Sequence, residues 1–583
     1  MVSSDPNTLL RAFLWRKKWA YAVSTLAIVV SEMVMVQFPN LIGKFTDALG
    51  KGRLDMTGVV HDAGWLALVG VGYVALYGVG QFRNGQIGRE FEYELRRQLF
   101  LHWENLHTGY FRKRSVGDLL NHAMNDVRAV REAMSGGLNI LTNAVFLLLT
   151  TLWMTLRTIS VPLTLASMVP LLFLPFFIIW WGPQIRLASR RVQEALSEMA
   201  DLSEESLSSI KVIKTTGNED VEVGRFTSKV DRIVDQQMAM FRKSTLFQSF
   251  IPLMGSLSFA IALLYGGYLT ATHQIELGMF VAFTLYLAMI ITPLQQIGFV
   301  INNFQRASAS MGRLRTLFGE QPAIADRVDA SSLPRPTGEL RVDLPSFTYP
   351  DATEKTLHHL RFHLDAGQTL GIVGRTGAGK TTLVNLLPRI FEPPAKSVFL
   401  DGVDVLDIRL SDLRGAIAYV PQDGFLFSAK VGENIGFGKL TPSVGEIETA
   451  ARDAAIYEEI MAFGQKFETE IGERGIALSG GQKQRTAMAR ALIKEAAVLI
   501  LDDSLSAVDM VTEKQIIERL RELRHGKTTV IVAHRLSAVR HANQIVVLEK
   551  GQIVERGTHA ELLDRNGIYA SMWRLQSEGG DRP

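Results

Sequence analysis

The chain has 583 residues, of which 47% are hydrophobic and 21% charged, with a net charge of +3 and no cysteine. This length predicts about two to four domains. A net charge so close to neutral, without a basic cluster, argues against nucleic acid as a partner. The lack of cysteine excludes a disulfide framework, a thiolate metal site and a cysteine nucleophile.

The N-terminal half is predicted to be a membrane domain. Its N-terminus lacks the layout of a signal peptide, because Arg16, Lys17 and Lys18 stand directly ahead of a long apolar segment. A bilayer core of about 30 Å is crossed by about 20 helical residues. Six segments are long and apolar enough for this, at about 19–42, 65–82, 138–155, 161–181, 245–270 and 279–302.

The loops between these segments alternate in length and charge. Residues 83–136 and 182–244 are long and rich in Arg and Lys, whereas the other three loops are short. The positive-inside rule therefore places the N-terminus and both long loops in the cytoplasm. We expect a multi-pass protein of the cytoplasmic membrane whose helices continue well into the cytosol.

Three polar residues within the apolar segments are candidates for contact with a substrate. Glu32 lies about 20 Å along the first helix, counted from Trp19 at about 1.5 Å per residue. A carboxylate at that depth is expected to face protein or a water-filled cavity. Gln295 and Gln296 lie in the sixth segment. For all three, hydrogen bonding between packed helices is the alternative interpretation.

The second half follows a polar, proline-containing connector and alternates short strands with amphipathic helices. Thr369–Val373 is a predicted buried strand, and the sequence GRTGAGKT follows it and opens a helix. This is a P-loop in the expected strand–loop–helix setting, where backbone N–H groups cradle phosphates, Lys380 reaches the β- and γ-phosphates and Thr381 offers a hydroxyl to Mg²⁺. The predicted nucleotide-binding residues here are Gly374, Arg375, Thr376, Gly377, Ala378, Gly379, Lys380, Thr381 and Thr382.

Two consecutive carboxylates end an apolar strand about 120 residues later. Asp502 is the predicted acidic partner in the Mg²⁺ shell, and Asp503 is the candidate general base. His534 ends a further buried strand, Thr529–Ala533, and is a candidate for contact with the γ-phosphate. A purely structural strand-end residue is the alternative for Asp502 and His534.

The chain resembles the half-size ABC exporters, in which six membrane helices precede one ATP-binding cassette. The P-loop, YVPQDGFLF, LSGGQ, SAVD and His534 stand in family order over essentially the whole chain. The resemblance implies an all-α six-helix transmembrane domain at 1–318, a linker at 319–338 and an α/β P-loop cassette at 339–583. It implies ATP and Mg²⁺ as ligands and adds, as site residues, Tyr349 against adenine, Gln422 at the Mg²⁺ and the reaction, and Leu478, Ser479, Gly480, Gly481, Gln482 and Asp509.

The resemblance also implies a mechanism. Two cassettes would pair head to tail, with each ATP held between one P-loop and the opposite LSGGQ, and closure would turn the membrane domains from inward-facing to outward-facing. Force would pass through short cytoplasmic helices near Ser115–Leu119 and Glu204–Val212. The stretch IGERG, Ile471–Gly475, looks like an exporter segment near the cytoplasmic loops. Six helices form half a translocation path, so a second half-transporter is required.

Asp503 departs from the family pattern, which has glutamate at this position. The shorter side chain withdraws the carboxylate by roughly one C–C bond, and a misplacement of about 1 Å can cost about 100-fold in rate. We therefore expect this P-loop site to bind ATP and hydrolyse it slowly, while the intact LSGGQ completes the site of a partner. The profile resembles the impaired-site subunit of Gram-positive heterodimeric multidrug exporters. A homodimer with two slow sites is the alternative.

The expected function is ATP-driven export of hydrophobic or amphipathic small molecules from the cytoplasm, in contact with membrane lipid. Lipid flipping by the same machine is one alternative. A regulatory ATP-binding subunit with little turnover is another. No motif in the sequence identifies the substrate.

Overall fold

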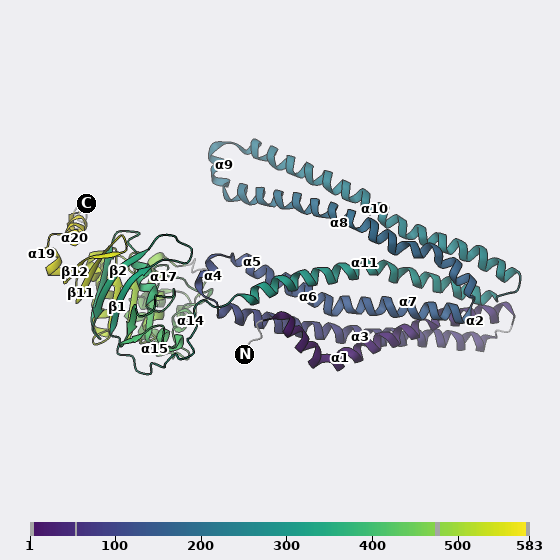
Figure 1. Ribbon diagram of the computed structural model, residues 1–583, viewed down its shortest axis with the longest axis horizontal. Helices are drawn as coiled ribbons and strands as arrows, with labels where there is room; N and C mark the ends of the chain where they lie inside the picture. The colour runs from purple at the N-terminus through teal and green to yellow at the C-terminus, as the bar shows by residue number, and fades with distance from the viewer. Residues whose placement is uncertain (1–4, 53–54, 473–477, 579–583) are drawn as a thin grey trace. The chain divides into compact units, whose positions relative to one another are not determined.

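The computed structural model describes residues 5–52, 55–472 and 478–578, with only the backbone of Gln295 and Ile297. The chain forms two compact units. The helical unit comprises Met1–Glu104 and Ser115–Glu320, and the α/β unit comprises Asn105–Arg114 and Gln321–Pro583 (Figure 1). The fold class is as predicted, whereas the domain boundaries at 318 and 338 stay predictions.

Six helical segments among the described residues are long and apolar enough to cross a membrane, each 43 to 53 residues in length. Since about 20 residues suffice to span the bilayer core, each has length left over to extend beyond it. The first segment is broken at Val36 because Pro39 has no N–H to continue the ladder of the preceding helix. The segments are α1 (Pro6–Met35) with α2 (Gln37–Gly50), α3 (Met56–Glu104), the stretch Val116–Thr158 that ends in α7 (Leu138–Thr158), α8 (Val161–Ser208), α10 (Glu219–Ala271) and α11 (Leu277–Gly319).

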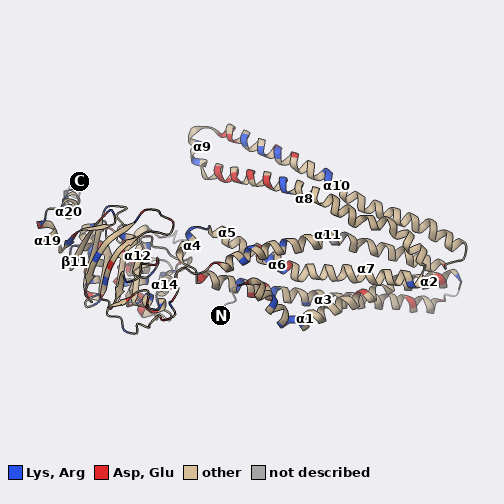
Figure 2. Cartoon of the chain, in the orientation of Figure 1, with Lys and Arg blue, Asp and Glu red and all other residues tan. Residues whose placement is uncertain are grey.

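Charged side chains are unevenly distributed along these helices. Figure 2 shows Lys, Arg, Asp and Glu gathered along α8 and α10 at the end that carries α9, while the remainder of both helices is almost free of charge. Exposed apolar side chains such as Leu165, Leu172 and Phe176 lie on this uncharged part of α8. The uncharged part matches the predicted spans, and the charged part matches the predicted cytosolic extensions.

Short elements interrupt the two long loops. The first loop contains two π-helical turns, which tend to occur at functional positions in helices. Ser115 Oγ accepts a hydrogen bond from the Asp118 N–H at 3.1 Å and caps the short helix predicted near it. The elements are α4 (Thr108–Arg112), α5 (Val116–Asn121), η1 (His122–Asp126), α6 (Val127–Glu132), η2 (Ala133–Gly137) and, in the second loop, α9 (Ile210–Thr216).

The α/β unit contains two main sheets. In the larger one, in the order β12-β11-β3-β10-β9-β6, all neighbours are parallel except β11 and β12. The smaller sheet is antiparallel, in the order β2-β1-β4-β5. The strands are β1 (Leu340–Phe347), β2 (Leu357–Leu364), β3 (Thr369–Gly374), β4 (Val398–Leu400), β5 (Val403–Asp404), β6 (Ile417–Val420), β9 (Val498–Asp502), β10 (Thr528–Val532), β11 (Gln544–Glu549) and β12 (Gln552–Gly557), with β7 (Ala429–Lys430) paired to β8 (Glu470–Ile471).

The larger sheet is buried on both faces, as expected for parallel strands. Along β9, Val498 and Ile500 pack into the core shared with β1 and β2, whereas Leu499 and Leu501 pack into the core shared with the helices. This alternation explains the continuous apolar run before Asp502. The helices are α12 (Lys380–Leu386), α13 (Leu410–Ala416), α14 (Val431–Gly436), α15 (Val444–Asp453), α16 (Tyr457–Ala462), η3 (Lys466–Glu468), α17 (Gly480–Leu492), α18 (Met510–Leu523), η5 (Leu536–Val539), α19 (His559–Asp564) and α20 (Ile568–Glu578).

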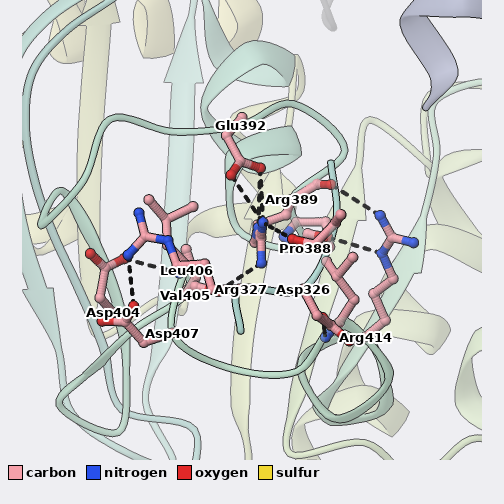
Figure 3. A network of polar contacts seen from close by, with 12 residues as sticks. Asp326, Arg327, Pro388, Arg389, Glu392, Asp404, Val405, Leu406, Asp407 and Arg414 are labelled. Atoms are coloured by element: carbon pink, nitrogen blue, oxygen red, sulfur yellow. Dashed lines mark hydrogen bonds and ion pairs between the residues drawn. The ribbon is translucent and has the colours of Figure 1, made fainter. Parts of the chain in front are cut away.

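Part of the predicted linker is held against the α/β unit by a polar network around Arg389 (Figure 3). The fully buried Arg389 guanidinium donates to the Ala325 carbonyl at 3.1 Å and to both Glu392 carboxylate oxygens at 3.0 Å. The Leu410 N–H donates to Asp326 Oδ1 at 2.7 Å. Because a buried guanidinium needs several acceptors, this segment is fixed to the P-loop core rather than trailing from it.

Candidate nucleotide-binding site

The P-loop connects β3 to α12 at the carboxyl end of the parallel strands, where open α/β sheets bind ligands. Two glycines are required by close packing and backbone conformation. A Cβ on Gly374 would lie 2.2 Å from the Leu548 carbonyl oxygen, and Gly379 has φ +96° with Leu357 Cδ2 2.6 Å from its missing Cβ. Glycine at these positions lets the loop turn tightly and leaves its N–H groups available to phosphate oxygens.

Lys380 lies over this loop. Its Nζ donates to the Gly374 carbonyl at 2.8 Å and to the Arg375 carbonyl at 3.2 Å, and the side chain is buried. Burial lowers the pKa of Lys380, although Asp503 and Asp502 act in the opposite direction. The two loop carbonyls therefore hold the ammonium group against the P-loop.

Thr381 and Asp502, the two predicted partners of Mg²⁺, lie in contact, and Thr381 Oγ1 donates to Asp502 Oδ1 at 3.1 Å. The Tyr419 hydroxyl lies 3.0 Å from Asp502 Oδ2 and 3.0 Å from Asn385 Oδ1. Burial raises the pKa of Asp502, and the Asp503 carboxylate adds to this, against hydrogen bonds from Tyr419 and Thr381. A bound cation would stabilise the ionised form of this buried carboxylate.

Thr381 and Asp502 could hold a Mg²⁺ ion that is also bound to phosphate oxygens. Mg²⁺ prefers hard oxygen ligands and is usually held by one or two protein groups together with phosphate oxygens and water. The Thr381 hydroxyl and the Asp502 carboxylate supply such ligands side by side. Within the described ranges, no group of three or more His, Asp or Glu side chains could hold an ion without the nucleotide.

The side chains of Gln422, Asp503 and His534 come close together, although these residues lie far apart in the sequence. Asp503 Oδ2 accepts from Gln422 Nε2 at 3.4 Å and lies 4.0 Å from His534 Nε2. Asp503 has φ +47°, a left-handed conformation uncommon outside glycine, and its N–H donates to the Val532 carbonyl at 2.9 Å. The backbone is therefore fixed, so the reach of the carboxylate depends on side-chain length.

Tyr349 lies beside the P-loop helix, where its hydroxyl is 2.9 Å from Thr382 Oγ1. Its ring packs edge-on against Phe391, with 4.9 Å between centroids. The short helix α4 contributes the Arg112 guanidinium, 6.0 Å from the Tyr349 ring centroid, and Lys113 pairs with Asp351 at 2.6 Å. The helix that joins the α/β unit is thus α4 and not the segment 115–119, which belongs to the helical unit.

The LSGGQ turn opens α17. Ser479 caps this helix, since the Gln482 N–H donates to Ser479 Oγ at 3.3 Å and the Gln482 side chain accepts from the Ser479 N–H at 2.9 Å. Asp509 caps α18, where its Oδ2 accepts from the Thr512 N–H at 2.9 Å. Among the described residues, no hydrogen bond or ion pair joins positions 478–482 to the P-loop, Asp502 or Asp503. Of the IGERG stretch, Glu473, Arg474 and Gly475 lie outside the described residues.

The candidate substrate residues lie in the helical unit. Glu32 is 1% exposed, and its Oε1 accepts from Asn143 Nδ2 at 2.6 Å, which favours hydrogen bonding between α1 and α7. Its Oε2 has no partner among the described residues. Gln296 Oε1, on α11, is likewise buried and without a described partner. The Gln295 side chain is outside the described set, and substrate contact by these three residues stays a prediction.

Sequence reasoning missed Tyr419 and Asn385, which complete the surroundings of Asp502. The available signal was the position of Tyr419 on β6, directly before the predicted Gln422 motif. Because β6 and β9 are neighbours, Tyr419 near the end of β6 comes close to Asp502 at the end of β9. Nothing local in the sequence says which two strands are neighbours.

Comparison with known proteins agrees with this geometry. Residues 21–294 match the family described as "ABC transporter transmembrane region", and residues 357–506 match the family described as "ABC transporter". The chain is 36% identical over 573 residues, 97% of each chain, to a probable multidrug resistance ABC transporter ATP-binding/permease protein, YheI, of Bacillus subtilis. It is 34% identical over 518 residues, 88% of each chain, to an ATP-dependent lipid A-core flippase of Chromobacterium violaceum. A bacterial Atm1-family ABC exporter with ATP bound has a similar structure, with a TM-score of 0.81 and 26% identity over 96% of this chain and 99% of the other.

Proposed function

The chain belongs to the ABC transporters, as a half-transporter with one membrane region and one ATP-binding domain, and on that premise we propose that it exports hydrophobic or amphipathic small molecules from the cytoplasm with a slow ATP site of its own. Half-transporters of this kind work as dimers, so the transport path is shared with a second subunit. The name of the Bacillus subtilis relative supports the multidrug class of substrate.

The surroundings of Asp503 carry the proposal of a slow site. A general base must come within about 3 Å of the water that it activates. The backbone of Asp503 is fixed by its hydrogen bond to Val532, so the side chain cannot be advanced by a small shift of the strand end. Gln422, which follows β6, and His534, which follows β10, lie within 4.0 Å of this carboxylate on either side of it.

The other groups are suited to binding and charge neutralisation. The P-loop N–H groups and Lys380 would hold the β- and γ-phosphates, and Thr381 and Asp502 would hold Mg²⁺. When bound, Mg²⁺ neutralises charge on the phosphate oxygens. Tyr349 would lie against adenine, with Arg112 of α4 beside it. ATP would therefore be bound firmly and hydrolysed slowly.

A heterodimer follows from the contrast between Asp503 and the intact Leu478–Gln482 turn. This turn would complete the site on a partner that carries the glutamate. Co-purification of the chain from its native membrane is the first experiment. Recovery of a second half-transporter with glutamate after the magnesium aspartate supports the heterodimer, and recovery of this chain alone contradicts it.

ATP hydrolysis by the purified chain tests the slow site. Asp503→Glu is expected to raise turnover by roughly 10- to 100-fold, because it restores the missing methylene. Asp503→Asn, which keeps the length and removes the base, is the matched control and should stay at or below the unsubstituted rate. Rapid hydrolysis by the unsubstituted chain, with no increase in the Asp503→Glu variant, would contradict the proposal.

Lipid flipping is the second candidate, supported by the similarity to a protein named as a lipid A-core flippase. Reconstituted dimers distinguish the two functions. Stimulation of ATP hydrolysis by amphipathic drugs supports export, whereas movement of labelled lipid without drug stimulation supports flipping. A dimer that shows neither response would point instead to a regulatory ATP-binding subunit.

A further inference from the structure

A basic groove lies between α1 and α3 at the N-terminal end of the helical unit. It is lined by Phe13, Arg16 and Lys17 of α1 and by Arg83, Gln86, Arg89, Glu90, Tyr93 and Glu94 of α3. The contributing residues of α3 recur at intervals of three and four, so they share one face of that helix. Figure 2 shows Lys and Arg positions in blue on both α1 and α3.

The groove keeps a net positive charge, because four basic side chains line it together with two glutamates, Glu90 and Glu94. Glu94 pairs with Arg97, outside the groove, at 3.9 Å. Lys17 pairs with Glu90 at 2.5 Å. Over the parts of the chain that the structure describes, no carboxylate lies within ion-pair distance of Arg16, Arg83 or Arg89, and all three side chains are exposed. Three arginines around one groove repel one another, so an anion that contacts them together is favoured.

The groove lies at the cytoplasmic end of the first two membrane spans. The predicted first span begins at Trp19, and the second ends at Phe82, one residue before Arg83. Trp15 and Trp19 are 67% and 75% exposed, and Lys18 Nζ lies 3.8 Å from the Trp15 ring centroid. Exposed tryptophans beside lysines and arginines are typical of the level of lipid headgroups.

We propose that this groove binds the phosphate headgroup of an anionic phospholipid of the cytoplasmic leaflet. Guanidinium groups recognise phosphate oxygens with paired hydrogen bonds, and basic pockets between membrane helices on this side are suited to such headgroups. Trp15 and Trp19 would lie beside the glycerol and upper acyl region of the same lipid. The bound lipid would hold α1 against α3 and is separate from any exported molecule.

The experiment uses the full chain in phosphatidylcholine nanodiscs that contain a trace of spin-labelled phosphatidylglycerol or spin-labelled phosphatidylcholine. The immobilised fraction of each label gives the selectivity for the anionic lipid. Arg83→Gln with Arg89→Gln is expected to reduce this selectivity by about 10-fold. The matched control is Arg186→Gln with Arg242→Gln, which removes two exposed arginines at the cytoplasmic ends of the fourth and fifth spans.

The outcomes distinguish specific lipid binding in the groove from attraction of anionic lipid by positive charge elsewhere on the surface. An equal loss of selectivity in both pairs of variants, or none in the groove pair, overturns the proposal. Displacement of the labelled lipid by inorganic phosphate at constant ionic strength assigns the groove to free phosphate and also overturns it. Arg83→Lys with Arg89→Lys should retain most of the selectivity, and this rescue excludes misfolding as the cause of the loss.

Discussion

Two regions of the α/β unit are proposed to contact nucleotide, the P-loop site and the Leu478–Gln482 turn, and only the second has every residue that the family pattern expects. Around the P-loop, Lys380, Thr381 and Asp502 lie within hydrogen-bonding reach of their expected neighbours, but the residue after Asp502 is one methylene short. At the start of α17 the LSGGQ turn is intact, and its cap is formed by Ser479 and Gln482. On the proposed function, binding and hydrolysis depend on different residues in this chain, and hydrolysis is weakened without loss of binding.

The largest expected effect is on binding at the chain's own site. Lys380→Ala should weaken ATP binding by at least about 100-fold, because it removes a buried positive charge aimed at the phosphates. Binding of a fluorescent ATP analogue to the purified chain measures this. Lys514→Ala, an exposed lysine on α18, is the control and should bind normally. Similar affinities for the two variants would contradict the assignment of the P-loop.

Substitution in the LSGGQ turn should have the opposite effect, with hydrolysis lowered and ATP binding unchanged. Gly480→Asp is expected to leave ATP binding to the purified chain unchanged and to lower hydrolysis by the assembled dimer about 100-fold, because a carboxylate there repels the partner's phosphates. Aspartate in the first helical turn stabilises the helix, and a Cβ on Gly480 meets Ala507 Cβ at an ordinary 3.6 Å.

Gly445→Asp in the first turn of α15 is the matched control, since a Cβ there has nothing within 4 Å. It should leave both binding and hydrolysis unchanged. If Gly480→Asp weakened ATP binding by the chain alone, the two regions would not serve separate nucleotides.

A double-mutant cycle tests whether His534 acts on the group at position 503. With Asp503→Glu in place, His534→Ala should lower hydrolysis by about 10-fold. The loss should be smaller in the unsubstituted chain, because there the carboxylate that His534 would orient does not reach the attacking water. Initial rates of phosphate release supply the four values of the cycle. Equal losses in both backgrounds would show that His534 acts independently of this residue.

The smallest expected effect is on stability. The fold raises the pKa of Asp502, so ionising it costs stability in full above that pKa; the cost shrinks as the pH falls and is gone below the ordinary carboxyl pKa. Asp502→Asn should therefore raise the Tm of the nucleotide-free protein near neutral pH and have a smaller effect in acid. With Mg²⁺ and ATP added, the unsubstituted protein should gain more in Tm than the variant. A lower Tm for the variant at neutral pH would contradict a strained carboxylate.

Much of this molecule could be predicted because its signals are contiguous. An apolar run of sufficient length predicts a span whatever it packs against, and a P-loop carries its strand, turn and helix in one segment. The short side chain at Asp503 is also visible in sequence, because the motif fixes which residue stands next to Asp502. Loop charge predicts the orientation in the membrane.

The remainder depends on which distant segments meet. The order of β6, β9 and β10 brings Tyr419 to Asp502 and His534 to Asp503, and no local pattern specifies that order. Likewise, the pairing of Glu32 with Asn143 depends on the packing of α1 against α7. The sequence alone determined the spans, the P-loop and the missing methylene, since each lies within one continuous segment. Only the tertiary structure decided what surrounds the two aspartates and Glu32, because those contacts are made between segments that packing alone brings together.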